Sequence, residues 1–164
     1  MPFTEANFEN AIIELFRDEL GYDYLYGPNV ERDYTQPLYM EQLRASLQDI
    51  NSWLPKAAID EAINKITTYD VGSLVQKNAI FNDYLQNGVD INYYDGKAMR
   101  STRVRLIDYE QPQYNNFTIS NQWTIDEHSV KRADIIVFIN GLPLVVMELK
   151  SPSREETNVS EAYR

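Results

Sequence analysis

The feature that most constrains the fold is the segment 133–150, ADIIVFINGLPLVVMELK, in which two apolar runs flank Asn140-Gly141. An Asn-Gly pair between two β-prone runs is a strong local signal for a tight turn, so the segment predicts a β-hairpin. The second run is apolar on both faces until its end, which is typical of a central strand covered on both sides. We therefore expect a core hairpin whose open end carries Glu148 and Lys150.

The register of this hairpin decides whether Asp134 lies beside Glu148. A two-residue turn would place Asp134 opposite Met147, on the other face from Glu148. A three-residue loop over 139–141, with glycine in the left-handed position of a bulge, would pair Asp134 with Val146 and set it diagonally across from Glu148. We expect an odd loop or a β-bulge, and a regular two-residue turn without a bulge would exclude a shared site.

The amino-terminal segment predicts an amphipathic helix that begins after Thr4 and ends at Gly21. Glu9 lies at the edge of the apolar stripe, so its side chain can face inward. Glu14 shares its face with polar residues, and we expect it in solvent. The apolar stripe consists of Ile12, Ile13, Phe16 and Leu20.

The remaining segments alternate between helical and strand patterns. Together they predict an α+β (α/β-like) fold, in which a mixed sheet of about five strands is flanked by helices. A chain of 164 residues with 43% hydrophobic content can bury one sizeable core, so we expect a single domain over 1–164. The patterns predict a short strand at 22–27, helices at 38–55, 56–70 and 71–88, a hairpin about Asp95-Gly96, a strand at 117–125 and the start of a helix at 153–164.

Composition excludes several classes of protein. The chain has no cysteine and one histidine, which excludes a disulfide framework, a thiolate metal site and a histidine-rich zinc site. No apolar run approaches the roughly 20 residues of a membrane span. A net charge of −10 argues against a protein that binds nucleic acid over its whole surface, although it does not exclude a local site.

Two carboxylates and a lysine at one strand end suit phosphodiester chemistry. Asp134 and Glu148 can share a divalent hard cation, for which Mg²⁺ is the first choice, and Lys150 can orient a water or offset charge that grows on phosphate. The spacing Asp-x13-Glu-x-Lys fits the PD-(D/E)xK pattern of nucleases. Such a short pattern also occurs by chance, and the alternative is that these residues form the solvated end of a strand.

Four basic residues are candidates for contacts with DNA phosphates. Arg103 and Arg105 share a face of one predicted ribbon, and Lys131 and Arg132 precede Asp134. Contacts of this kind position DNA without reading its sequence. The alternative is a solvated strand face whose charge is balanced by nearby acids.

Five segments, in this order, resemble the amino-terminal endonuclease domain of the type I restriction enzyme R subunit, which is the motor and cleavage subunit. They are LGYDYLYG, LRASLQDIN, LQNGVDI, RLIDYEQPQYNNFTISNQWTI and RADIIVFINGLPLVVMELKSP. The resemblance runs from about Thr4 to Arg164. It implies a restriction-endonuclease-like PD-(D/E)xK core with Asp134 and Glu148 as metal ligands and Lys150 as the catalytic lysine. The acid of the family's first helix corresponds best to Glu9.

The resemblance also implies an activity, that of a type I site-specific deoxyribonuclease. The implied reaction is Mg²⁺-dependent cleavage of double-stranded DNA after ATP-driven translocation, in a cytoplasmic complex with methyltransferase and specificity subunits. No Walker-type GxxxxGK[ST] segment is present, so we expect ATP to bind elsewhere in a longer subunit of which this chain is the amino-terminal fragment. We also expect the family's Gln-x-x-x-Tyr motif to lie beyond Arg164.

Two other functions compete with cleavage by this domain. One is a docking or regulatory module of the restriction complex, whose acidic surface contacts other subunits. The other is a nuclease of the same superfamily that acts in repair.

Overall fold

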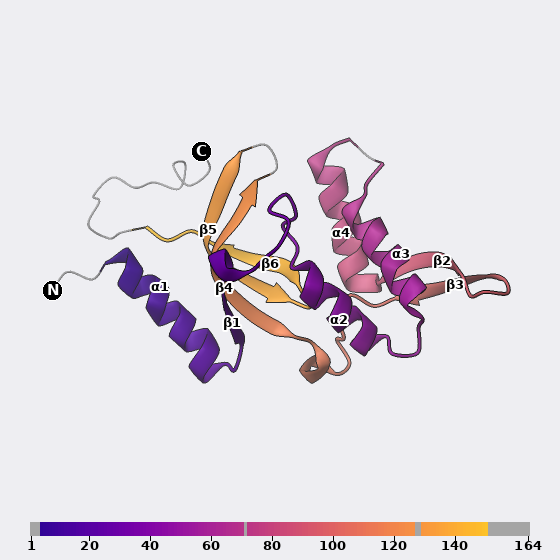
Figure 1. Cartoon of the computed structure of the whole chain (residues 1–164), viewed down its shortest axis with the longest axis horizontal. Coiled ribbons are helices and arrows are strands. Elements are labelled where there is room, and N and C mark those ends of the chain that lie inside the picture. Colours follow the sequence, from indigo (N-terminus) through magenta and orange to yellow (C-terminus); the bar gives the residue numbers. More distant parts are fainter. Residues whose placement is uncertain (1–3, 71, 127–128, 151–164) are drawn as a thin grey trace. The chain divides into compact units, whose positions relative to one another are not determined.

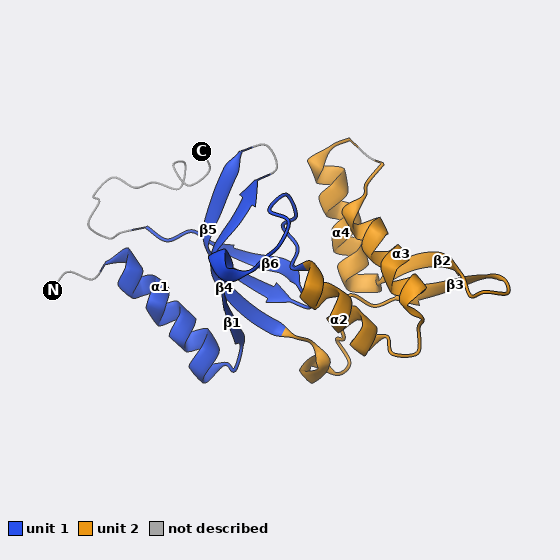
Figure 2. Ribbon diagram, in the orientation of Figure 1, with its two compact units in different colours: residues 1–39, 117–164 blue, residues 40–116 orange. Residues whose placement is uncertain are grey.

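The computed structural model describes residues 4–70, 72–126 and 129–150. The chain divides into two compact units (Figure 2): unit 1 comprises Met1–Tyr39 and Phe117–Arg164, and unit 2 comprises Met40–Asn116. Helices and mixed sheets confirm the predicted α+β class. The single domain expected over 1–164 stays a prediction. The predicted helix at 153–164 lies outside the described residues.

Unit 1 begins with helix α1 (Glu5–Glu14), which continues as a π-helical turn over Leu15–Glu19. A capping box starts it: the Asn7 amide N–H donates to Thr4 Oγ1 at 3.3 Å, and the Thr4 amide N–H donates to Asn7 Oδ1 at 3.1 Å. Gly21 adopts a φ of +73° just after the helix, as expected for a helix stop. The predicted helix and its cap are therefore confirmed.

In the described residues, the sheet of unit 1 has four strands in the order β1-β4-β5-β6 (Figure 1). β1 is parallel to β4, and the other neighbours are antiparallel. The prediction of about five strands in one sheet is therefore corrected to four in this sheet and two in unit 2. The bounds are β1 Asp23–Tyr26, β4 Phe117–Asp126, β5 Val130–Ile139 and β6 Leu142–Met147, with a short 3-10 turn at Gly27–Asn29.

Among the described strands, the second strand of the predicted core hairpin, β6, lies at one edge of this sheet. Val145 and Val146 have exposed fractions of 44% and 63%. The expectation of a central strand covered on both sides is therefore wrong for β6. An unbroken apolar run does not distinguish a central strand from an edge strand when the turn residues and the register are not known.

The β5–β6 turn has two residues, because Asn140 (φ 53°) and Gly141 (φ 79°) both adopt positive φ and Ile139 pairs with Leu142. The expected three-residue loop is therefore wrong. The other expected feature, a β-bulge, is present. Phe138 pairs with Pro143 and the next pair joins residues 137 and 145, so residue 144 has no partner in the ladder. A proline in a strand is itself typical of a bulge, and Pro143 marks this one.

The bulge changes which residues meet at the open end of the hairpin. The last pair of the ladder is Ile135 with Met147, so the next residue of β5, Asp134, comes opposite the residue after β6, Glu148. The three-residue loop predicts Asp134 opposite Val146 and diagonal to Glu148. The structure therefore corrects the expected register by two residues, and continuing the ladder by one residue beyond Ile135–Met147 sets the two acids opposite each other.

The two faces of the sheet carry separate apolar clusters. The cluster on the α1 side contains Ile13, Ile119 and Ile135, and the other cluster contains Trp123 and Ile136. Residues 119 and 123 would share a face in a regular strand, since side chains alternate with a period of two. They belong to different clusters here, so the alternation of β4 reverses between them.

Over residues 40–70 and 72–116, unit 2 contains three α-helices and one hairpin, as the sequence predicts. The elements are α2 Met40–Ile50, α3 Lys56–Thr67, α4 Leu74–Asn87, β2 Val89–Tyr94, β3 Met99–Val104 and a 3-10 turn at Pro112–Tyr114. β2 and β3 are antiparallel about the predicted Asp95-Gly96 turn. The fully buried side chains Leu43, Leu47 and Val104 belong to the core of this unit.

Candidate functional site

The predicted residues of the hairpin lie together at its open end. The Leu149 amide N–H donates to Asp134 Oδ2 at 2.7 Å, and Lys150 Nζ lies 3.4 Å from Glu148 Oε1. The side chains of Glu148 and Lys150 have exposed fractions of 45% and 44%, whereas Leu149 is buried with Ile13 in the cluster on the α1 side. Leu149 therefore anchors the segment, and its two charged neighbours remain accessible.

Glu9 is half-buried on α1 and turns toward the sheet, as its place in the helix predicts. Asn121 Nδ2 donates to Glu9 Oε1 at 2.6 Å. Gln122 Nε2 lies 3.2 Å from Oε1 and 3.3 Å from Oε2 of the same carboxylate. The register of β4 and β5 sets residue 122 opposite Asp134, because residue 121 pairs with 135 and residue 123 pairs with 133. Glu9 thus reaches the sheet at the level of Asp134.

Asn121 and Gln122 are polar residues of this region that sequence reasoning missed. The signal that could have identified them is two adjacent amide side chains in the middle of the otherwise well-buried strand FTISNQWTI. Asn121 has an exposed fraction of 8%, and its Oδ1 accepts a hydrogen bond from the Tyr24 hydroxyl at 3.0 Å. Burial, and then the negative charge of Glu9, raise the pKa of Tyr24, so its hydroxyl stays protonated at neutral pH.

The basic residues predicted to contact DNA lie in both units. Lys131 and Arg132 are exposed on β5, where they pair with Ile125 and Thr124 of β4. In unit 2, Arg103 Nε and Nη2 donate to the two carboxylate oxygens of Asp90, at 2.7 and 2.9 Å. This ion pair lowers the pKa of Asp90 and raises that of Arg103. The charge of Arg103 is therefore balanced across the β2–β3 ladder.

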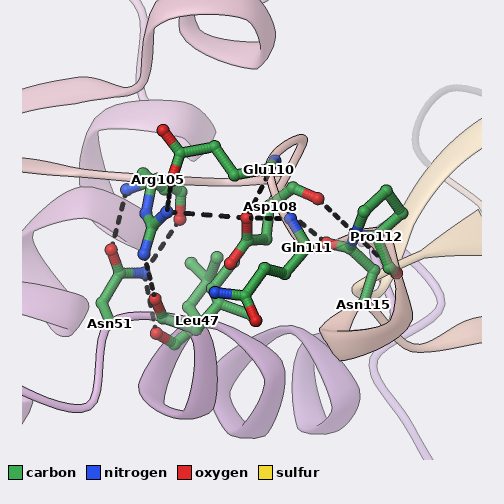
Figure 3. A network of polar contacts seen from close by, with 9 residues as sticks. Leu47, Asn51, Arg105, Asp108, Glu110, Gln111, Pro112 and Asn115 are labelled. Atoms are coloured by element: carbon green, nitrogen blue, oxygen red, sulfur yellow. Dashed lines mark hydrogen bonds and ion pairs between the residues drawn. The ribbon is translucent and has the colours of Figure 1, made fainter.

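Arg105 belongs to a polar network of unit 2 (Figure 3). Its amide N–H donates to Asn51 Oδ1 at 2.9 Å, and Asn51 Nδ2 returns a bond to the Arg105 carbonyl at 2.9 Å. The guanidinium lies 3.5 Å from Asp108 and 5.0 Å from the centre of the Trp53 ring. These contacts give Arg105 a structural role, and a DNA contact by Arg105 stays a prediction.

Asp134 and Glu148 offer oxygen donors only, which is the donor set that Mg²⁺ and Ca²⁺ prefer. Within residues 4–70, 72–126 and 129–150, no group of three or more His, Cys, Asp and Glu side chains is arranged to hold a metal ion. Mg²⁺ is commonly bound by one or two carboxylates and keeps several waters, so the two carboxylates of Asp134 and Glu148 are a suitable donor set for this ion. The metal and the roles of these residues stay predictions.

Comparisons with known proteins agree on one family. The family model described as "Type I restriction enzyme R protein N terminus" matches residues 2–164. The type I restriction enzyme HindI endonuclease subunit of Haemophilus influenzae is 36% identical over 98% of this chain and 16% of its own length. A Methanocaldococcus jannaschii protein, described as a candidate type I restriction enzyme MjaIXP endonuclease subunit, is 28% identical over 91% of this chain and 15% of its own.

The chain thus spans about a sixth of the length of these relatives. Across the described part of the chain, no helix is both long and apolar enough to cross a membrane. The match covers both units of the structure, so Glu9, Asp134 and Glu148 all lie within it.

Proposed function

Since the chain belongs to the type I restriction enzyme R protein N-terminus family, we propose that it is the DNA-cleaving domain of a type I restriction enzyme endonuclease subunit. The proposed reaction is metal-dependent hydrolysis of phosphodiester bonds in double-stranded DNA, on a restriction-endonuclease-like PD-(D/E)xK core. The observation that carries the proposal is the bulged hairpin, which sets Asp134 opposite Glu148 and puts Lys150 next to them.

In this proposal Asp134 and Glu148 hold Mg²⁺. The metal, when bound, supplies a Lewis acid that polarises a phosphoryl oxygen and lowers the pKa of a water. Leu149 keeps Asp134 in place through its amide N–H, at 2.7 Å from Oδ2. Asp134 is thereby held by the backbone of the same segment that carries Glu148, which fixes the spacing of the two acids.

Lys150 supplies the positive charge of the proposed site. Its ammonium lies 3.4 Å from Glu148 Oε1 and is partly exposed, so it can reach a phosphate or a water that approaches the hairpin end. A cation at this position offsets negative charge that grows on the phosphate during attack. Lys131 and Arg132 of the adjoining strand β5 are proposed to contact phosphates away from the reacting bond.

The rest of the proposed activity belongs to the whole subunit. The relatives are named as endonuclease subunits of type I restriction enzymes, which supports double-stranded DNA as substrate and assembly with methyltransferase and specificity subunits. ATP-driven translocation before cleavage and a cytoplasmic location are part of the same proposal.

Lys150→Ala in the full-length subunit tests the proposal. We expect Mg²⁺-dependent cleavage to fall by roughly a hundredfold or more, as when a charge-stabilising donor is removed from an active site. Assembly with the other subunits should be unchanged. The matched control is Lys56→Ala, at the exposed start of α3, which should cleave like the wild type. Loss of assembly with Lys150→Ala would instead favour a docking role for this domain.

A further inference from the structure

We propose that Gln122 is a positioning residue for the Glu9 carboxylate: together with Asn121 and Tyr24 it holds this acid at the level of Asp134. The inference rests on the proposed function, since it assigns Glu9 a place in the cleavage site. It adds three residues of β1 and β4 that the nuclease pattern does not contain.

The first observation is the backbone of Gln122. Among the described residues, two that are not glycine have positive φ: Asn140, which sits in the two-residue turn, and Gln122, with a φ of 56°, in the middle of β4. Asparagine often adopts this conformation in turns, but glutamine inside a strand rarely does. Unusual backbone of this kind is found preferentially at functional sites.

The second observation is that the side chains of Asn121 and Gln122 point the same way. In a regular strand, neighbouring side chains point to opposite faces of the sheet. Asn121 and Gln122 are neighbours, yet both donate to the Glu9 carboxylate. Beyond them the alternation is reversed, so that Trp123 packs on the face away from α1. The left-handed residue thus directs two adjacent amides at one acid.

The third observation is the charge of the donors. The Glu9 carboxylate accepts hydrogen bonds from two neutral amides, and Gln122 Nε2 lies within 3.3 Å of both carboxylate oxygens. Neutral donors orient a carboxylate and leave its negative charge uncancelled, whereas an arginine or lysine would form an ion pair. Unit 2 shows that contrast, since Asp90 is paired with Arg103. A carboxylate held in this way can act on a hydrated cation or on a water.

The fourth observation is the support behind the two amides. The Tyr24 hydroxyl donates to Asn121 Oδ1 at 3.0 Å, which orients the amide so that its NH₂ group faces Glu9. Gly27 lies against the same stretch of β4: a Cβ there would come within 2.8 Å of the carbonyl oxygens of Asn121 and Gln122. Gly27 therefore packs closely against the backbone of Asn121 and Gln122 and supports its conformation.

The test is a double-mutant cycle between Gln122 and Glu9, measured as the Mg²⁺ dependence of DNA cleavage by the assembled enzyme with the full-length subunit. Gln122→Gly removes the amide and suits the positive φ, so assembly should be preserved. We expect a drop in cleavage of roughly tenfold to a hundredfold, the size of a lost charge-assisted hydrogen bond, together with a higher Mg²⁺ requirement. Glu9→Gln should have a similar or larger effect, and Asn10→Ala on the same helix should have none.

The cycle distinguishes positioning from a merely structural role. If Gln122 acts through Glu9, the double variant is no worse than Glu9→Gln alone, because the two residues form one unit. Multiplied effects would overturn the inference. Tyr24→Phe gives a second, milder probe, which should reduce cleavage in the wild-type background and leave the Glu9→Gln enzyme unchanged. An effect of equal size in both backgrounds would also overturn it.

Asp134→Asn, measured in the same assay, separates the two proposals. Normal cleavage by Asp134→Asn would contradict the proposed function itself. Loss of cleavage by Asp134→Asn, with wild-type behaviour of Gln122→Gly and Tyr24→Phe, would leave the proposed function standing and overturn the positioning role alone.

Discussion

The two hairpins of this molecule have similar turn sequences but differ in the charged residues that face each other across their strands. Both turn at an Asx-Gly pair, Asp95-Gly96 in unit 2 and Asn140-Gly141 in unit 1. In the β2–β3 hairpin an acid faces a cation across the ladder, as Asp90 faces Arg103. In the β5–β6 hairpin a bulge brings two acids opposite each other. Opposite charges therefore face each other across the β2–β3 ladder, whereas like charges face each other at the open end of the β5–β6 hairpin, which is the candidate site.

The difference arises from register as well as from composition. The β2–β3 ladder is regular from Val89–Val104 to Tyr94–Met99, so the residue opposite each side chain follows from a simple count along the sequence. The β5–β6 ladder shifts by one residue next to Pro143, and the shift decides which residue faces Asp134. For the number of residues that β6 has, the bulge at Leu144 therefore determines whether the two acids meet.

The largest expected effect comes from changing the number of residues in β6. Insertion of an alanine between Leu144 and Val145 should move Glu148 out of register with Asp134 and abolish cleavage. Deletion of Leu144 should remove the bulge and keep Asp134 opposite Glu148, so cleavage should survive although stability falls with the lost side chain. Cleavage assays of the two variants in the full-length subunit check this. Equal loss in both would contradict the register of the β5–β6 ladder.

A smaller effect is expected from Gly27→Ala in unit 1. The new Cβ would meet two carbonyl oxygens of β4 at 2.8 Å, and overpacking of this kind costs about 1–3 kcal/mol of unfolding free energy. In the described part of the chain, a Cβ added at Gly72 of unit 2 would meet no atom within 4 Å other than those of its chain neighbours, so Gly72→Ala should change stability by less than about 0.5 kcal/mol. Urea unfolding of both variants makes the comparison. A Gly27→Ala variant as stable as the wild type would contradict this prediction, because the backbone of β4 would then move away from the new Cβ without a loss of stability.

The smallest expected effect is the loss of stability of the β2–β3 turn at acidic pH. Hydrogen bonds from Arg100, and then from the Ala98 and Lys97 amides, lower the pKa of Asp95 to about 2. Its folded-state pKa is below its ordinary value, so its stabilising effect is complete above about pH 4 and is lost as the pH falls toward 2. An NMR titration of the carboxyl carbon checks the value. Arg100→Ala should raise this pKa, and a wild-type Asp95 that titrates near pH 4 would contradict the prediction.

Much of the fold could be predicted from local signals. Thr4 and Gly21 mark the ends of the first helical segment, and the two Asx-Gly pairs mark both hairpins. The edge position of β6 could not be predicted, because strand order depends on pairings between segments far apart in the sequence. Pro143 did carry a signal for the bulge, which the length of the turn alone does not reveal.

The candidate site was only partly predictable for a related reason. The pattern of acids and lysine identifies Asp134, Glu148 and Lys150, and helical spacing turns Glu9 inward. The role of Gln122 depends on a left-handed backbone inside a strand, which no local propensity predicts for glutamine. Its contact with Glu9 joins residues more than 110 positions apart, so it becomes visible only in the folded chain.

In the proposed function the β5–β6 hairpin carries the cleavage site and the β2–β3 hairpin does not. A comparison of Asp134→Asn with Asp90→Asn, in Mg²⁺-dependent cleavage by the assembled enzyme, distinguishes the two hairpins. We expect Asp134→Asn to lose on the order of a thousandfold in rate, equivalent to the several kcal/mol that a metal site contributes to a transition state, and Asp90→Asn to cleave like the wild type. Cleavage by Asp134→Asn at the wild-type rate would contradict the assignment of the site to the β5–β6 hairpin.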